Sequence, residues 1–123
     1  MSQGRCSATF VTVMMLCLLV LHSQVADAAV YTVGGANGWT FNTESWPAGR
    51  RFRAGDTLVF NYSPSAHNVV AVNKPGYDNC SAPKGAKVYQ TGNDNIKLVK
   101  GPNFFICSFQ GHCQSGMRIA ITV

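Results

Sequence analysis

Short segments suited to β-strands, with turn sequences between them, run through the chain from residue 29 to residue 123. Where apolar and polar residues alternate, every second side chain shares a face, which is typical of a half-buried strand. Segments of this kind, or short apolar runs suited to a strand buried on both faces, are 29–33, 56–62, 68–72, 95–99, 103–107 and 117–123. Turn sequences such as AGD, KPGYDN, TGND and KGPN separate them at the interval of a β-sandwich or Greek-key barrel. The sequence therefore predicts one small all-β domain, with a turn or two of helix only in the segment 74–85.

The first 28 residues predict a secretory signal peptide. Arg5 precedes the apolar run Phe10–Leu21, which is too short to span a bilayer comfortably but suits the central region of a signal. Ala26 and Ala28 supply the small residues that a signal peptidase requires, so we place the cleavage after Ala28. An uncleaved amphipathic anchor is the minor alternative. The domain itself is then 29–123.

The charge of the chain is basic but dilute. The 123 residues carry a net charge of +5, and removal of 1–28 takes away Arg5 and Asp27 together, so the charge is unchanged. Only Arg50, Arg51 and Arg53 approach a cluster, and no nucleic-acid-binding pattern accompanies them. An acidic polysaccharide, an anionic membrane or an acidic protein each fits as a partner, and composition does not choose among them. No second apolar run follows, so we expect a secreted, soluble monomer that does not span a membrane.

The cysteine count predicts one disulfide and one free thiol. Cys6 and Cys17 leave with the signal, and the remaining three are Cys80, Cys107 and Cys113. An odd number in an oxidising compartment leaves one thiol for another purpose. Three pairings are possible. Adjacent side chains in extended chain point to opposite sides, so Cys113 faces away from its neighbour His112, and this ranks the bridge Cys80–Cys113 first.

Four side chains with soft or intermediate donor atoms predict a copper site. In CSFQGHCQSGM, Cys107, His112 and Met117 are each separated by four residues, and turns at SFQG and CQSG would bring them together. Thiolate, thioether and imidazole together favour copper over magnesium, calcium or manganese. His67 supplies the second imidazole. Two nitrogens and one sulfur in a trigonal plane, with a long bond to methionine, form the blue-copper electron-transfer arrangement.

The same residues resemble a known family. A histidine on one strand, then Cys-x4-His-x4-Met with a cysteine after the second histidine, is similar to the phytocyanins of plants and, within them, to the plantacyanins or plant basic blue proteins. The resemblance covers 29–123 and includes VGGANGWTFN, WPAGRRFRAGDTLVFNY and HNVVAVNKPGYDNC. It implies a cupredoxin-like Greek-key β-sandwich of about seven to eight strands. It further implies one type 1 copper ion held by His67, Cys107, His112 and Met117, a Cys80–Cys113 bridge, and an extracellular or cell-wall location with a role in redox chemistry or reproductive signalling.

The site chemistry assigns a role to each predicted residue. Cys107 would supply the thiolate, His67 and His112 the rest of the plane, and Met117 a distant ligand that tunes the potential. Asn68 would pin the two ligand loops together and donate a hydrogen bond to the sulfur of Cys107. The rings expected to keep water from the thiolate are Phe104, Phe105 and Phe109. If the ring edge of His112 reaches the surface, it offers a redox partner the shortest route to the metal.

Other functions fit the sequence less well. A multicopper oxidase needs many more histidines than the three in this chain. Structural zinc would leave Met117 unused, and nucleophilic catalysis by Cys107 competes with metal binding for the same thiol, so we expect no enzyme activity. The main alternative is an extracellular binding or signalling protein in which copper is structural or incidental, acting in the cell wall or reproductive tissue.

Overall fold

The computed structural model describes residues 27–123, so the predicted signal peptide lies almost wholly outside the described residues. These residues form seven strands, one α-helix and two short 3-10 helices. The strands are β1 (Val30–Thr32), β2 (Thr57–Asn61), β3 (Val69–Val72), β4 (Val88–Tyr89), β5 (Asn93–Lys97), β6 (Pro102–Ile106) and β7 (Arg118–Thr122). The helices are α2 (Lys74–Asn79), η1 (Gly35–Asn37) and η2 (Cys113–Ser115). The predicted all-β fold is confirmed.

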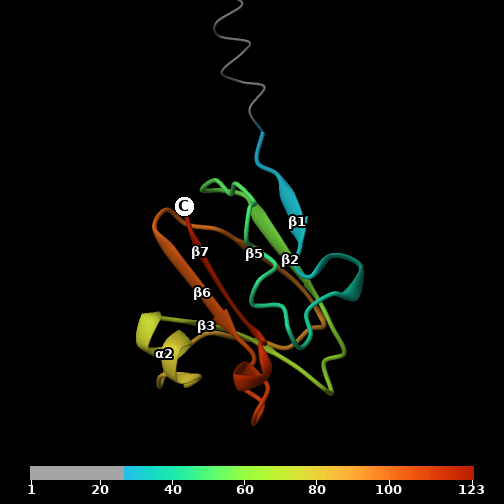
Figure 1. The fold of residues 1–123 in the computed structure, drawn as a ribbon, viewed down its shortest axis with the longest axis vertical. Helices are drawn as coiled ribbons and strands as arrows, with labels where there is room; N and C mark the ends of the chain where they lie inside the picture. Colours follow the sequence, from blue (N-terminus) through green and yellow to red (C-terminus); the bar gives the residue numbers. More distant parts are fainter. Residues whose placement is uncertain (1–26) are drawn as a thin grey trace, which may run out of the picture.

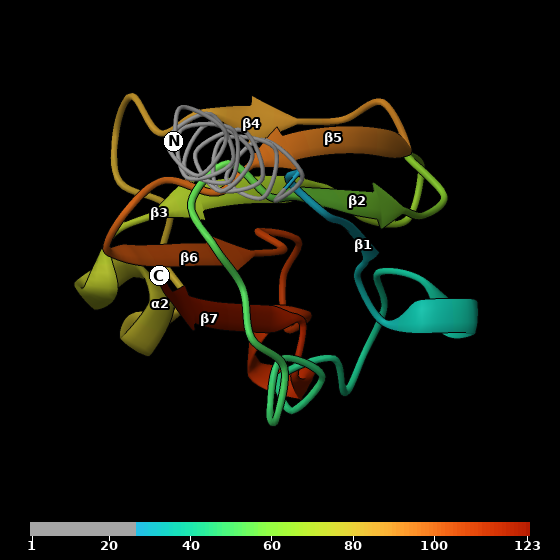
Figure 2. The same ribbon diagram turned by 90° about the horizontal axis from the view of Figure 1, so that it is seen from above.

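The strands form two sheets (Figure 1). One has the order β1-β2-β5 and the other β4-β3-β6-β7. Among the strands of the described residues, only β1 and β2 pair in parallel. Viewed along the long axis in Figure 2, α2 lies beside the second sheet, and its contacts are with β3 and β6.

The core lies between the two sheets and is formed by alternate residues of the strands. Leu58 and Phe60 of β2, and Ile119 and Ile121 of β7, are buried while their neighbours are more exposed, as the alternation predicts. The ring of Phe60 contacts Trp39 and Phe105 edge to face, at centroid distances of 5.1 and 5.4 Å. These contacts bring the loop after η1 and both sheets into one apolar cluster.

A second, smaller apolar cluster joins α2 to the back of the second sheet. Val69 belongs to the main core, whereas the adjacent Val70 packs with Ile106 and Cys113 on the other face. The prediction that this strand is buried on both faces is thus confirmed at these two valines. The predicted bridge Cys80–Cys113 is present, with Cα atoms 5.6 Å apart, and it ties the end of α2 to η2.

Local sequence explains the short helix in the segment 74–85. The side chain of Asn73 caps its first turn by accepting a hydrogen bond of 2.9 Å from the backbone N–H of Gly76. Pro75 stands in the first turn, where its fixed φ suits a helix and no N–H is needed. The helix ends at Cys80, which has a left-handed φ of 53°. Among residues 27–123, no helix has the length and apolarity needed to cross a membrane.

Candidate metal centre

The strand order brings the predicted ligands to one end of the sandwich. His67 precedes β3, Cys107 follows β6 and Met117 precedes β7. β6 runs antiparallel to both of its neighbours, and its last residue, Ile106, pairs with Val70 of β3 on one side and Arg118 of β7 on the other. The end of β6 and the starts of β3 and β7 therefore meet at the same end of the sheet. His112 lies in the loop that connects Cys107 to η2. Residues far apart in the sequence are therefore neighbours here.

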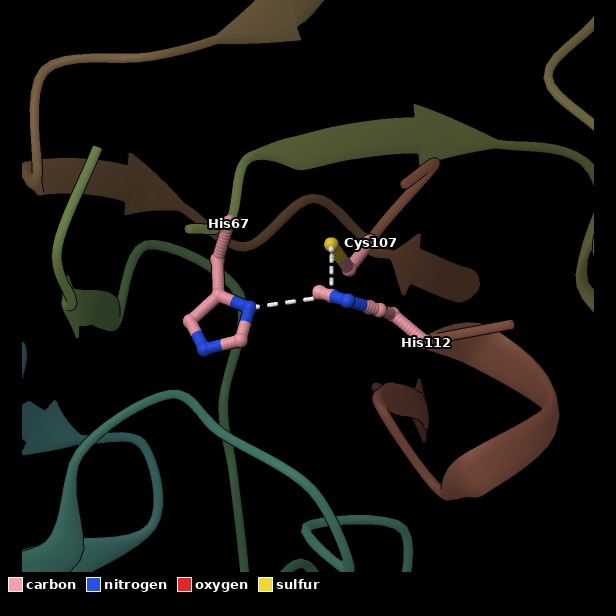
Figure 3. A group of neighbouring side chains, drawn as sticks. All are labelled: His67, Cys107 and His112. Carbon is pink, nitrogen blue, oxygen red and sulfur yellow. Dashed lines mark hydrogen bonds between the residues drawn. The ribbon is translucent and has the colours of Figure 1, made fainter. Parts of the chain in front are cut away.

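Three donor atoms converge at this end of the sheet (Figure 3). The ligand atoms of His67, Cys107 and His112 all lie within 4.8 Å of one another. The two Nδ1 atoms of the histidines are 3.1 Å apart, and Sγ of Cys107 is 3.5 Å from Nδ1 of His112. Two metal–nitrogen bonds of about 2.0–2.1 Å to a common ion span this nitrogen–nitrogen distance at an angle of roughly 100°. The geometry therefore fits a single metal ion between the rings and the thiol.

Main-chain hydrogen bonds fix the loop that carries Cys107, His112 and Met117. The N–H of Cys107 donates to the carbonyl of Met117 at 3.0 Å, and the N–H of Met117 donates to the carbonyl of His112 at 3.1 Å. The glycines at the two predicted turns, Gly111 and Gly116, have left-handed φ angles of 79° and 87°. These main-chain hydrogen bonds, and its position directly before β7, place Met117 at the same end of the molecule as the other three predicted ligands, and its side chain is fully buried.

Asn68 connects the two loops that carry the ligands, through a residue that the sequence did not point to. Its side-chain carbonyl accepts a hydrogen bond of 2.9 Å from the N–H of Ser108, and its Nδ2 donates to Oγ of Ser108 at 2.8 Å. The indole of Trp39 donates to the main-chain carbonyl of Asn68 at 2.9 Å. The sequence predicted a pin between the loops together with a bond to the sulfur of Cys107. In the described chain Asn68 bonds to the residue after Cys107 instead.

Aromatic rings surround the histidines, and one of them was missed. Phe41, with 43% of its surface exposed, packs edge to face against His67 and His112 at centroid distances of 5.4 and 4.8 Å. Phe109 contacts His112 at 5.6 Å. Nothing in the local sequence around Phe41 signals this role, because the contact depends on how the loop after η1 folds across the site.

The phenylalanines of β6 divide between the two faces of their sheet. Phe105 shares the core with Cys107, which directly follows the strand, as expected of residues two apart where the alternation of the strand continues. Phe104 faces the other way, and its ring lies 5.3 Å from that of Tyr77 in α2. The prediction that Phe104 flanks the thiolate is therefore wrong, because alternation along the strand directs it to the helix.

The surroundings of the cluster favour neutral imidazole and a protected thiol. Partial burial, together with repulsion from His112, lowers the pKa of His67 below its ordinary value. A neutral imidazole is the form that binds a metal. Cys107 is a free, completely buried cysteine, whereas His67 and His112 are partly exposed. The site thus combines a buried sulfur with two partly exposed histidines, His67 and His112.

Comparisons with known proteins agree on one family. A family model described as a plastocyanin-like domain matches residues 39–117. The chain is 67% identical over 93 residues to a basic blue protein of Cucumis sativus, a match that covers 76% of this chain and 97% of that protein. It is 52% identical over 124 residues to a chemocyanin of Lilium longiflorum, covering 99% and 98% of the two chains. Among solved structures, a cucumber basic protein described as a blue copper protein superposes with a TM-score of 0.76 at 66% identity, covering 77% of this chain and 99% of that one.

Proposed function

The chain belongs to the phytocyanin family of plastocyanin-like, cupredoxin domains, and on that premise we propose that it is a secreted protein that binds one type 1 copper ion and transfers single electrons. The observation that carries this proposal is the convergence of two imidazole nitrogens and a buried thiol within 4.8 Å. When bound, copper supplies a one-electron Cu(II)/Cu(I) couple. His67, Cys107 and His112 would hold the ion, with Met117 as a weak fourth ligand.

Rigid support of the ligands suits them to electron transfer. Cys107 and Met117 adjoin paired strands, and their main chains are bonded to each other. Asn68 fixes the loop of His67 to the residue after Cys107 through two hydrogen bonds. Side chains held in this way change position little when the charge at the site changes, so little reorganisation energy opposes the transfer of an electron.

His112 and Phe41 form the surface through which we propose that electrons leave and enter. Both are at least partly exposed, and their rings are in contact. A redox protein or a small redox molecule that rests on Phe41 would lie next to a ligand of the metal. Since His67, Cys107 and His112 are all engaged in metal binding in this proposal, no thiol and base remain for nucleophilic catalysis, and we propose an electron carrier rather than an enzyme.

The start of the folded domain supports secretion with cleavage after Ala28. Within residues 27–123, Ala29 is the first residue tied to the sheet: its carbonyl accepts from Thr57 at 2.9 Å, and its N–H donates to the carboxylate of Asp56 at 2.8 Å. Asp56 is only 2% exposed. Cleavage at this point would leave the sheet intact and place the new α-ammonium group against a buried carboxylate. We therefore propose an extracellular location, in the apoplast or cell wall, which N-terminal sequencing of the secreted protein would test.

The copper proposal is tested by a spectroscopic titration of the wild type and two variants. Copper(II) added to the metal-free wild type should produce an intense visible band, from charge transfer between thiolate and copper, that saturates at one equivalent. The band should disappear on one-electron reduction and return on reoxidation. Cys107→Ser should fold but give no such band, while the exposed Gln114→Ala serves as the matched control in the same loop. A wild type that stays colourless with copper would refute the proposal.

A further inference from the structure

A basic cleft lies at the end of the sandwich opposite the metal centre. It has a volume of about 700 Å³ and is lined by the start of β1, the loop that leads into β2, and the end of β7. In Figure 1 the start of β1, the last part of the loop before β2 and the end of β7 lie toward the upper end of the domain, whereas η2 and the loop of His112 lie at the lower end. Arg50, Arg51 and Arg53 all line the cleft and all are exposed. The proposed electron-transfer function makes no use of them.

The guanidinium groups of this cleft lack carboxylate partners within residues 27–123. The two ion pairs in that range join Lys74 to Asp78 and Arg118 to Glu44. The buried Asp94 is hydrogen-bonded to Tyr62 and Thr91. Asp56, which lies on the cleft, is satisfied by the N–H groups of Ala29 and Arg53. Asp27 also lines the cleft, and it leaves the protein if cleavage follows Ala28.

Aromatic rings form one side of the cleft and position one of its arginines. Tyr31 and Phe52, both lining residues, pack edge to face at 4.8 Å. Behind them Trp46 contacts Phe52 at 5.7 Å. The guanidinium of Arg50 lies 4.9 Å above the ring of Trp46 and donates to its main-chain carbonyl at 3.0 Å. Arg50 is thus held in place by a cation–π contact without losing its positive charge.

We propose that this cleft binds an acidic polysaccharide, a chain of uronic acid residues whose carboxylates pair with Arg50, Arg51 and Arg53. A guanidinium group donates two parallel hydrogen bonds to a carboxylate, which makes arginine the cation suited to this ligand. Tyr31 and Phe52 offer apolar ring surface against which the C–H faces of a sugar can pack.

The shape of the site favours a polymer chain over a membrane surface. A concave site can enclose a chain, whereas a membrane-binding surface needs apolar side chains that project into the lipid. The rings of Tyr31 and Phe52 are partly buried in the wall of the cleft instead. Since the cleft and the metal centre lie at opposite ends, a protein bound to such a polymer keeps His112 open to a redox partner. The inference does not depend on copper binding.

The proposal is tested by calorimetric titration of the secreted protein with polygalacturonate oligomers at low ionic strength. Arg50→Gln/Arg51→Gln/Arg53→Gln should weaken binding by about tenfold or more, because three exposed ion pairs are each worth a few-fold. The matched control, Lys74→Gln/Lys84→Gln/Lys87→Gln, removes the same charge from exposed positions elsewhere. It should weaken binding by less than about threefold, since salt screens distant charges. Circular dichroism of both variants should match that of the wild type.

Two further probes separate the carboxylate chain from other anionic ligands. Fully methyl-esterified polygalacturonate should not bind, because it lacks the charged carboxylates. The protein should bind only weakly to vesicles of phosphatidylserine and phosphatidylcholine. The arginine triple variant and the lysine triple variant should bind these vesicles equally. Equal weakening by both variants, undiminished binding of the esterified polymer, or tight vesicle binding that needs the three arginines would each overturn the proposal.

Discussion

Removal of the Cys80–Cys113 bridge should lower stability by about 4 kcal/mol and leave the metal centre intact. The two cysteines are 33 residues apart. For a closed loop of about 34 residues, the chain-entropy model predicts that the bridge lowers the conformational entropy of the unfolded chain by roughly 12–13 cal/mol/K. At 25 °C this entropy stabilises the folded state by about 3.8 kcal/mol. The buried Cys113 also packs in the second apolar cluster, so substitution by alanine adds a small cavity cost of at most about 1 kcal/mol.

The variant for this test is Cys80→Ala/Cys113→Ala, which leaves no thiol able to form a new bridge with Cys107. Urea denaturation of the metal-free protein, followed by circular dichroism, should show the lower free energy of unfolding. The melting temperature should fall by roughly 20 °C, since the unfolding entropy of a domain of this size is about 0.2 kcal/mol/K. If the free energy of unfolding falls by less than about 1.5 kcal/mol, the chain-entropy reasoning is refuted.

The same variant should retain its copper spectrum while it is folded, although Cys113 is next to His112. The loop of His112 has supports besides the bridge: the N–H of Asn42 donates to Ser115, and that of Thr43 donates to Gly116 at 2.9 Å. A visible spectrum that changes in the folded variant would show that the bridge positions His112 directly. Spectra should be recorded well below the melting temperature of the variant, so that a change in the spectrum is not caused by unfolding.

Three other predictions follow from particular contacts. Gly116→Ala should cost at least about 2–3 kcal/mol of unfolding free energy, because its left-handed φ is combined with a Cβ only 2.9 Å from the backbone of Asn42. Gly111→Ala, at a similar φ but with open space around its Cβ, should cost about 1–2 kcal/mol, and equal losses in urea denaturation would contradict the clash. Burial, then the hydrogen bond to Asp94, raises the pKa of Tyr62 from 10.0 to about 12. The folded state thus prefers neutral Tyr62, so stability should be unaffected below pH 10 and fall between about pH 10 and 12, and Tyr62→Phe should remove that part of the fall in denaturation curves recorded across this range. A chain that begins at Ala29 should be more stable than one with two extra N-terminal residues by about 1 kcal/mol, because an α-ammonium bonds Asp56 more strongly than an amide does; equal melting temperatures would count against this ion pair.

The sequence predicted those features that depend on local periodicity and on residue chemistry. Alternation in β2 and β7 gave the correct buried face, because the period of a strand is two wherever it lies. Donor types and spacing grouped Cys107 with His112, and His67 was added because it is the other histidine of 29–123; the three do lie in one cluster. The cysteine count predicted one disulfide and one free thiol, and the pairing ranked first is the one present. The reason given for that ranking was wrong, because His112 has α-helical backbone angles and Cys113 begins η2, so the two neighbours do not lie in extended chain.

Features that depend on long-range contact were missed or misassigned. Phe41 reaches the two histidines across 26 and 71 residues of sequence, and no local pattern reports such a distance. Ser108 was overlooked because a serine in a loop has many possible partners, and only the folded chain shows that Asn68 is one of them. Phe104 was assigned to the thiolate by proximity in sequence, although strand alternation already directed it to the opposite face from Phe105.

Strand register links the apolar core to the position of the proposed ligands. Along β7, burial of Ile119 and Ile121 fixes which face of the strand turns inward. A slip of one residue against β6 would expose both and would turn Met117, immediately before the strand, away from the core. Burial of two isoleucines is worth about 3–6 kcal/mol, so such a slip is strongly opposed. The same alternation in β6 places Cys107 on the side of Phe105. The side chains of Cys107 and Met117 are therefore oriented by the packing of their strands, and the loops carrying His67 and His112 need only be fixed to that frame, as Asn68 and the main-chain bonds of Met117 do.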